Sequence, residues 1–163
     1  MTVRVGINGF GRIGRNFFRA VKQQGADIEI VAVNDLGDLK TMAHLLKYDS
    51  VMGRLGEDVS VVDGGIAVGA KQLKVLAERD PAKLPWGSLG VDVVIESTGV
   101  FTSRDKAALH LEGGAPRVIV SAPSDGADAT FVVGVNDGDF DPAAHKVVSN
   151  RSEEHTSELQ SLR

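Results

Sequence analysis

Three glycines near the start of the chain have the spacing of a phosphate-binding loop. Gly9, Gly11 and Gly14 form a G-x-G-x-x-G pattern that follows a β-like run at residues 3–8 and precedes a helix-like run at residues 13–24. In that setting the glycines permit a tight turn, a close approach of backbone to a pyrophosphate, and close packing of helix on strand. The helix N-terminus then offers free N–H groups and a partial positive charge. The run predicts a dinucleotide-binding site.

An acidic residue ends the next predicted strand. Residues 28–35 are mostly apolar and β-branched, which favours a buried parallel strand, and Asp35 is its last residue. A carboxylate at this point accepts hydrogen bonds from ribose hydroxyls and repels a 2′-phosphate, so we expect NAD rather than NADP. The alternative role for Asp35 is to cap the following helix. NADP is the less favoured alternative as the cofactor.

Polar residues follow the other predicted strands as well. Ser97 and Thr98 come after the buried run at 92–96, Ser121 comes after residues 117–120, and Asn8 ends the first strand. Ligands of open α/β sheets bind beyond the carboxyl ends of the strands. We therefore expect one crevice to collect these side chains.

The elements that must position these residues alternate between strand and helix patterns. A helix is predicted from Leu39 to about Tyr48, with Asp38 as its N-cap and Met42, Leu45 and Leu46 on one face. The remaining expected elements are an antiparallel hairpin at 59–68, a strand at 74–77, a helix at 104–111, and strands at 131–135 and 146–149. The predicted fold class is α/β, a Rossmann-type doubly wound, mostly parallel sheet with a small antiparallel insertion around residues 55–78.

Composition narrows the function. The 163 residues carry a net charge of −4, which argues against nucleic acid as the principal partner. Neither a membrane span nor a signal peptide is predicted, and we expect a soluble cytoplasmic protein. The chain has no cysteine, which excludes disulfides, thiolate metal sites and a cysteine nucleophile within it.

Several other residues are not expected to bind a ligand. The acidic run at 137–141 lacks the glycine and the closing glutamate of a calcium loop, so we expect a solvated turn and no metal site. Trp86 is expected to anchor packing. The four histidines lack ligand spacing and are expected to be surface or helix residues; they are His44, His110, His145 and His155.

Together these residues resemble the N-terminal half of the glyceraldehyde-3-phosphate dehydrogenase family. The resemblance covers residues 1–150. Its motifs, in order, are G-I-N-G-F-G-R-I-G-R (Gly6 to Arg15), H-L-L-K-Y-D-S (His44 to Ser50), A-E-R-D-P (Ala77 to Pro81), E-S-T-G-V-F (Glu96 to Phe101), S-A-P-S (Ser121 to Ser124) and V-V-S-N (Val147 to Asn150).

The resemblance implies an NAD-binding Rossmann domain over residues 1–150. It places Arg12 and Ile13 at the pyrophosphate, Asp35 at the adenosine ribose and Arg79 beside the adenine. The implied cofactor-binding residues are Asn8, Gly9, Gly11, Arg12, Ile13, Asp35, Arg79, Ser97, Thr98, Gly99 and Ser121, the last near the nicotinamide end. Members of the family are usually cytoplasmic homotetramers of glycolysis that oxidise an aldehyde phosphate to an acyl phosphate.

The chain departs from the family pattern after Asn150. The family's nucleophile is a cysteine in the run S-N-A-S-C-T-T-N, but here Ser149-Asn150 leads into Arg151-Ser152-Glu153. A carboxylate cannot replace a thiolate in forming a thioester. We therefore assign no catalytic residue, expect the catalytic domain to be absent from this chain, and expect the chain to be inactive.

Residues 151–163 differ in character from the rest. R-S-E-E-H-T-S-E-L-Q-S is what a common sequencing-library adapter encodes when it is read in frame, so we expect a foreign, disordered tail. Two alternatives stay open. One is a fragment of an enzyme that acts on a neighbouring aldehyde such as erythrose 4-phosphate, and the other is a stand-alone, non-catalytic dinucleotide-binding module.

Overall fold

The computed structural model describes residues 1–151, so the expected foreign tail lies, beyond Arg151, outside the described residues. The helices are α1 (Arg12–Gln24), α2 (Leu39–Lys47), α3 (Arg104–Ala107) and α4 (Leu109–Glu112), with 3-10 turns η1 (Pro81–Lys83) and η2 (Asp137–Asp139). The strands are β1 (Val3–Asn8), β2 (Ile28–Asn34), β3 (Tyr48–Asp49), β4 (Gly53–Arg54), β5 (Val59–Val62), β6 (Gly65–Val68), β7 (Lys71–Leu76), β8 (Val93–Glu96), β9 (Val118–Val120), β10 (Ala129–Thr130) and β11 (Val147–Ser149).

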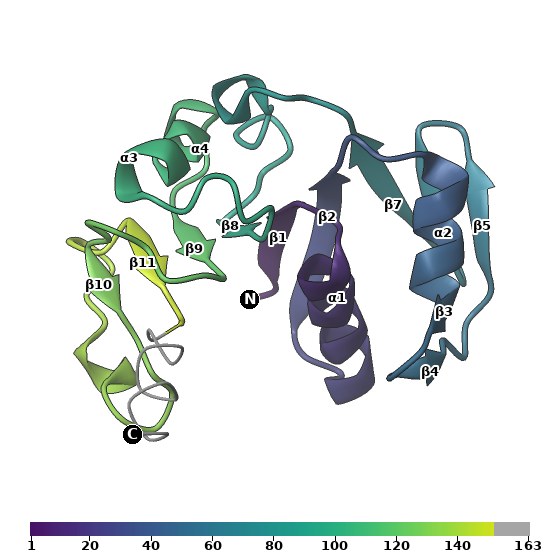
Figure 1. Ribbon diagram of the computed structural model, residues 1–163, viewed down its shortest axis with the longest axis horizontal. Coiled ribbons are helices and arrows are strands. Elements are labelled where there is room, and N and C mark those ends of the chain that lie inside the picture. Colours follow the sequence, from purple (N-terminus) through teal and green to yellow (C-terminus); the bar gives the residue numbers. More distant parts are fainter. Residues whose placement is uncertain (152–163) are drawn as a thin grey trace, which may run out of the picture.

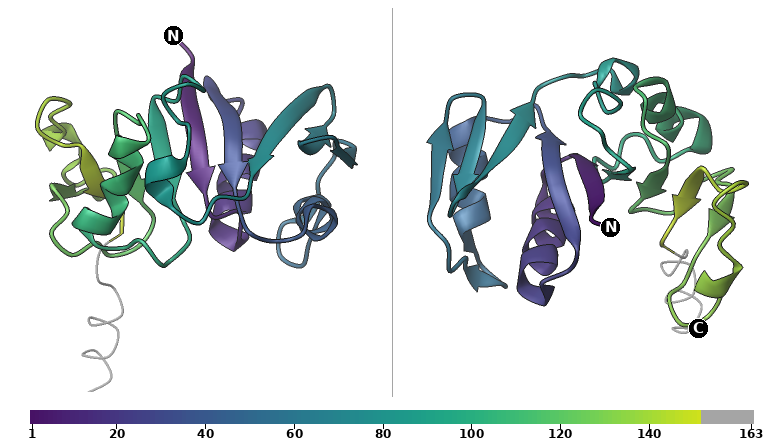
Figure 2. Two further views of the ribbon diagram at one scale, coloured as in Figure 1. Left: turned by 90° about the horizontal axis from the view of Figure 1, so that it is seen from above. Right: turned by 180° about the vertical axis from the view of Figure 1, so that it is seen from behind.

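One large sheet organises the molecule. Its strand order is β10-β11-β9-β8-β1-β2-β7-β6-β5, and β3 pairs with β4 separately. Neighbours from β10 to β7 pair in parallel, whereas β6 pairs antiparallel with both β7 and β5. In Figure 2 the purple β1 lies in the middle of the row of strands, between β8 and β2. The predicted parallel sheet with an antiparallel insertion is confirmed.

Helices cover both faces of the sheet. In Figure 1, α1 lies on one side of the row of strands and α3 and α4 lie on the other. On the first side Val5 and Ile7 of β1 pack into a cluster with Phe18 of α1 and Leu46 of α2. Successive residues of a strand point to opposite faces, so Val33 of β2 lies in this cluster and Ala32, beside it in the same strand, lies in another. This two-sided covering makes the sheet doubly wound.

Trp86 fills the opposite side of β1. Its side chain is fully buried in a cluster with Leu84 and Val94. A Cβ added to Gly6 would lie 2.5 Å from the Trp86 ring, so only glycine at that position lets the indole reach the sheet. The expectation that Trp86 anchors packing is confirmed.

The first βαβ unit agrees with the sequence prediction. Helix α1 begins after Gly11 and ends at Gly25, which adopts the left-handed conformation with φ 60°. Asp38 caps α2, its side chain accepting from the Thr41 N–H, as expected. Leu45 was predicted for the buried face of α2 but is 40% exposed, and Ala43 is buried instead.

Two predictions in the C-terminal part need correction. The helix expected at 104–111 is present, but it is interrupted at Ala108, so that it consists of α3 and α4 and ends at Glu112. The strand expected at 131–135 is absent, since β10 ends at Thr130 and residues 133–136 form a turn. There the Asn136 side chain accepts from the Val132 N–H and donates to the Thr130 carbonyl, which satisfies the backbone without a partner strand.

Candidate functional site

A pocket of about 420 Å³ lies at the carboxyl ends of the central strands. It is formed by the residues that end β1 and β2, by the segment after β7 and by the segment after β8. Its lining residues are Asn8, Gly9, Gly11, Asn34, Asp35, Leu36, Glu78, Arg79, Ser97, Thr98, Val100 and Phe101. This is the edge at which open α/β sheets bind ligands.

The three loop glycines differ in what a side chain would meet at each position. Gly9 has φ 91°, and a Cβ there would lie 2.7 Å from the Thr98 nitrogen. A Cβ on Gly14 would lie 2.2 Å from the Gly9 carbonyl oxygen, which would push α1 away from the loop. A Cβ on Gly11 would meet no atom within 4 Å. Gly11 therefore borders open space in the pocket, which a side chain would fill.

The N-terminus of α1 has no side-chain cap. Its N-cap is Gly11, no side chain accepts a hydrogen bond there, and the first turn holds no acidic residue. Helix α2, by contrast, is capped by the Asp38 carboxylate. The first N–H groups of a helix have no partner within it, and the helix dipole makes that end positive. The end of α1 beside Gly11 is therefore suited to an anionic group such as a phosphate.

Asp35 helps to shape the loop that it faces. Its Oδ2 accepts from the Phe10 N–H at 2.7 Å, and its Oδ1 accepts from the Gly37 N–H at 2.8 Å. Each carboxylate oxygen can accept a further hydrogen bond, because a carboxylate offers about four lone-pair sites. Asp35 does not cap α2, a role that Asp38 takes. The carboxylate thus lies in the pocket wall with capacity left for hydroxyl donors.

The structure brings together most of the residues predicted for the site and leaves others beside it. Those that line the pocket are Asn8, Gly9, Gly11, Asp35, Arg79, Ser97 and Thr98. Four predicted residues do not line it: Arg12, Ile13, Gly99 and Ser121. Ile13 lies in the first turn of α1 and is 49% exposed, and Gly99 has φ 75° in the turn after Thr98. Ser121 follows β9, one strand farther from the centre, and its N–H donates to the Glu96 carbonyl.

Arg12 is held by an acidic residue outside the pocket. Its guanidinium lies 3.4 Å from Asp49, whose carboxylate also accepts from the Met52 and Val51 N–H groups. These backbone hydrogen bonds, more than the positive charge of Arg12, hold the pKa of Asp49 below its usual value. Asp49 therefore stays ionised and keeps Arg12 beside the positive end of α1.

Sequence reasoning missed several residues of this site. Asn34, Leu36, Glu78, Val100 and Phe101 also line the pocket. Each is adjacent or close in sequence to a predicted residue, so the strand-end rule could have found Asn34 and its neighbours. His110 was expected as a surface or helix residue. It lies in α4 but is fully buried, and it contacts Glu96 and Trp86.

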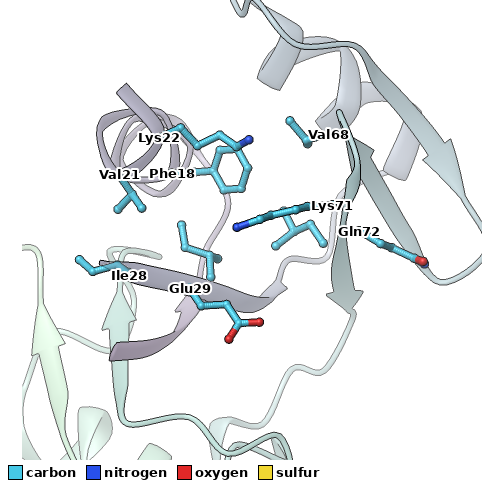
Figure 3. A pocket seen from close by; sticks show the side chains of 10 residues that line it. Phe18, Val21, Lys22, Ile28, Glu29, Val68, Lys71 and Gln72 are labelled. Atoms are coloured by element: carbon cyan, nitrogen blue, oxygen red, sulfur yellow. The ribbon is translucent and has the colours of Figure 1, made fainter. Parts of the chain in front are cut away.

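A second pocket, of about 290 Å³, lies at the other end of the strands. In Figure 3, Phe18 and Lys22 of α1 face Val68, the last residue of β6, and Ile28 at the beginning of β2 also lines the pocket. Lys22 is paired with Glu57. This pocket has no glycine loop and no helix N-terminus. It consequently lacks the features that would recognise a dinucleotide.

Residues 1–151 contain neither a candidate metal site nor a candidate membrane span. No cluster of acidic, histidine or cysteine side chains there could hold a metal ion. No helix within that part of the chain is both long and apolar enough to cross a membrane.

The chain is similar to proteins of one family. Residues 3–104 match the family model described as glyceraldehyde 3-phosphate dehydrogenase, NAD binding domain. Glyceraldehyde-3-phosphate dehydrogenase 1 of Streptomyces arenae is 62% identical over 152 residues, which are 93% of this chain and 46% of that protein. The Geobacillus stearothermophilus enzyme is 60% identical and glyceraldehyde-3-phosphate dehydrogenase 1 of Bacillus subtilis is 57% identical, each over 93% of this chain and 45% of the relative. The chain spans about half the length of the curated relatives it matches.

Proposed function

The chain belongs to the glyceraldehyde-3-phosphate dehydrogenase family and carries its NAD-binding domain, and we propose that NAD binds in the pocket at the carboxyl ends of β1, β2 and β8. The observation that carries this proposal is Gly11, which borders open space beside an uncapped helix N-terminus. A side chain would fill that space, and the free N–H groups suit the pyrophosphate. The proposed domain comprises residues 1–150.

The pocket residues divide by the part of the dinucleotide that they would hold. Gly9, Gly11 and the first turn of α1, with Arg12 and Ile13, would hold the pyrophosphate. Asp35 would accept from the adenosine ribose, and Arg79 would lie beside the adenine. Ser97, Thr98 and Gly99 would line the path toward Ser121 at the nicotinamide end.

We propose NAD rather than NADP as the preferred cofactor. Leu36 and Gly37 follow Asp35, and neither supplies a positive charge for a 2′-phosphate. The Asp35 carboxylate would repel that group. Isothermal titration calorimetry of the purified chain with both nucleotides tests this preference. Measurable binding of NAD with none of NADP is expected, and equal affinities would contradict the assignment of Asp35.

For the whole protein we propose a phosphorylating dehydrogenase that oxidises an aldehyde phosphate to an acyl phosphate. NAD, when bound, supplies the hydride acceptor. We further propose that the whole protein acts in glycolysis, in the cytoplasm and as a homotetramer. The names of the relatives support the dehydrogenase activity, and the resemblance of the motifs to the family supports the other proposals.

The chain itself is proposed to bind the cofactor but not to turn over substrate. It contains no cysteine, and thioester formation needs a thiolate. Purified chain, freed of the host's own dehydrogenase, should yield no NADH from glyceraldehyde 3-phosphate, NAD and phosphate. NADH production that co-purifies with the chain would overturn the proposal.

A further inference from the structure

Three buried polar side chains lie in a row at the base of the pocket. Asn34, Asn8 and Glu96 are the last residues of β2, β1 and β8, and the sheet register pairs Asn8 with both of the others. Their exposed fractions are 5%, 2% and 2%. Side chains at one register level of parallel strands point to the same face. The row therefore has to satisfy its hydrogen bonds within the protein.

The Glu96 carboxylate accepts four hydrogen bonds. Its Oε1 accepts from the backbone N–H of Thr98 at 2.8 Å and from the Thr98 hydroxyl. Its Oε2 lies 2.6 Å from Asn8 Nδ2 and 2.8 Å from His110 Nε2. A carboxylate has about four lone-pair sites, so all of them are used. Glu96 is thus a group that only accepts, with donors on every side.

Trp86 determines where the His110 ring proton lies. Its indole Nε1 is 3.0 Å from His110 Nδ1, and indole nitrogen can only donate. Nδ1 therefore carries no proton, and the neutral ring carries its proton on Nε2, directed at Glu96. Asn8 Nδ2 and His110 Nε2 are 3.4 Å apart and are both donors, so they converge on Glu96 Oε2 rather than bonding to each other.

The direction of the Asn8 amide is fixed from the opposite side. Asn34 Nδ2 donates to Asn8 Oδ1 at 2.7 Å and to the Glu78 carbonyl at 2.8 Å, and Asn34 Oδ1 accepts from the Glu78 N–H at 2.8 Å. The backbone groups of Glu78 cannot exchange roles, so the Asn34 amide cannot flip. Asn8 Oδ1 must then accept, which directs its Nδ2 toward Glu96.

We propose that Glu96 is a positioning residue of the dinucleotide pocket, with His110 in support. Glu96 does not line the pocket, but it holds two residues that do, Asn8 and Thr98. It joins the ends of β1 and β8 to the segment that begins at Thr98. The inference rests on the proposed NAD site, and it assigns to Glu96 the task of keeping that site in shape before the cofactor arrives.

The substitution Glu96→Gln tests the proposal. Glutamine has the same shape, but its amide nitrogen must face either the Thr98 N–H or the pair formed by Asn8 and His110, which places donor against donor. The expected result is an NAD affinity about tenfold weaker or more, from loss of hydrogen bonds to a charged group. In the ligand-free chain, hydrogen exchange of the Thr98 amide should quicken by about tenfold. The unpaired buried donor should also lower the melting midpoint, so the NAD affinity is measured at a temperature at which both chains are folded.

Val94→Ala is the matched control. Val94 is fully buried on the same face of β8, two residues before Glu96, and packs with Trp86. Its truncation should lower the melting midpoint but leave the NAD affinity within about twofold, because it removes packing and no hydrogen bond. An affinity loss in Val94→Ala equal to that in Glu96→Gln would make Glu96 merely structural and overturn the proposal.

The outcomes separate this inference from the proposed function. If the unaltered chain fails to bind NAD, the proposed function fails, and Thr98 amide exchange in ligand-free Glu96→Gln still decides the role of Glu96. Unchanged Thr98 exchange overturns the inference. If Glu96→Gln does not fold, ¹⁵N NMR of His110 in the unaltered chain decides. A proton on Nε2 is expected, and a proton on Nδ1 would overturn the arrangement.

Discussion

At the residue scale, Asp35 has two roles, of which its position at the end of a strand predicted only the one in the pocket. Its carboxylate accepts from the Phe10 and Gly37 N–H groups, so it shapes the glycine loop as well as facing the pocket. Loss of the charge should therefore affect the loop and the proposed ribose contact together.

We predict that Asp35→Asn weakens NAD binding by about tenfold or more. The asparagine Nδ2 would oppose one of the two backbone N–H groups, and the 2′-phosphate of NADP would meet less repulsion. Calorimetry with both nucleotides should show a smaller difference between them than in the unaltered chain. Asp38→Asn serves as the control, because asparagine also caps helices well. Equal losses in the two variants would remove Asp35 from the site.

At the element scale, the β1-α1-β2 unit was predictable because its signals are local. The signals are the continuous buried run that ends β1, the glycines at both ends of α1 and the acid after β2, and each acts within a few residues. The strand predicted at 131–135 failed because its apolar pattern has no partner: Val133 and Val135 are 87% and 79% exposed. The hydrogen bonds of Asn136 that replace the strand are not visible in hydrophobic periodicity.

The site divides in the same way. Strand-end position predicted Asn8, Asp35 and Thr98, but the network of Glu96 with His110 depends on a helix that packs across the sheet. Glu96 and His110 are 14 residues apart, and no sequence periodicity of a helix or a strand predicts a contact at that separation. Such partners follow from tertiary packing and require the structure.

Asp128 provides a pH-dependent test at this scale. Its Oδ2 accepts from the Lys146 and Val147 N–H groups, and its Oδ1 accepts from Arg104, so it joins β11 to α3. Burial acts to raise the pKa of Asp128, but the two backbone hydrogen bonds and Arg104 together outweigh it and hold the pKa below its usual value of 3.8. Because the pKa is lower in the folded state than in the unfolded state, the ionised carboxylate stabilises the fold at pH values above 3.8. This stability is lost as the pH falls through the folded-state pKa.

We predict that Asp128→Asn lowers the free energy of unfolding by about 1–2 kcal/mol near neutral pH. Whichever way the asparagine amide is turned, its nitrogen would face a donor, either Arg104 or the backbone N–H groups of Lys146 and Val147. The difference from the unaltered chain should shrink below pH 3.8. Urea unfolding followed by circular dichroism across this range measures it. A difference that stays constant with pH would show that the Asp128 charge contributes nothing.

At the scale of the whole molecule, the turns that follow β8 and β10 carry exposed apolar side chains. Val100, Val133 and Val135 are 61%, 87% and 79% exposed. Exposed apolar surface favours association when it forms contiguous patches. We predict that the chain self-associates as its concentration rises, and that Val133→Thr with Val135→Thr reduces this. Sedimentation velocity measures both, and identical profiles for the two chains would exclude these valines from the contact.

The loop from Gly9 to Gly14 is proposed to receive a dinucleotide, and titration of a variant in this loop tests the proposal. Gly11→Val adds a side chain where a Cβ meets no atom within 4 Å, and the backbone at Gly11 has φ −72°, so the fold can accommodate it. Valine is a poorer N-cap than glycine, so a small fall in the melting midpoint is expected. The new side chain would occupy the space that a pyrophosphate needs. At a temperature at which both chains are folded, calorimetry should therefore detect NAD binding by the unaltered chain and none by Gly11→Val. Equal NAD binding by both chains would exclude the loop from the cofactor site.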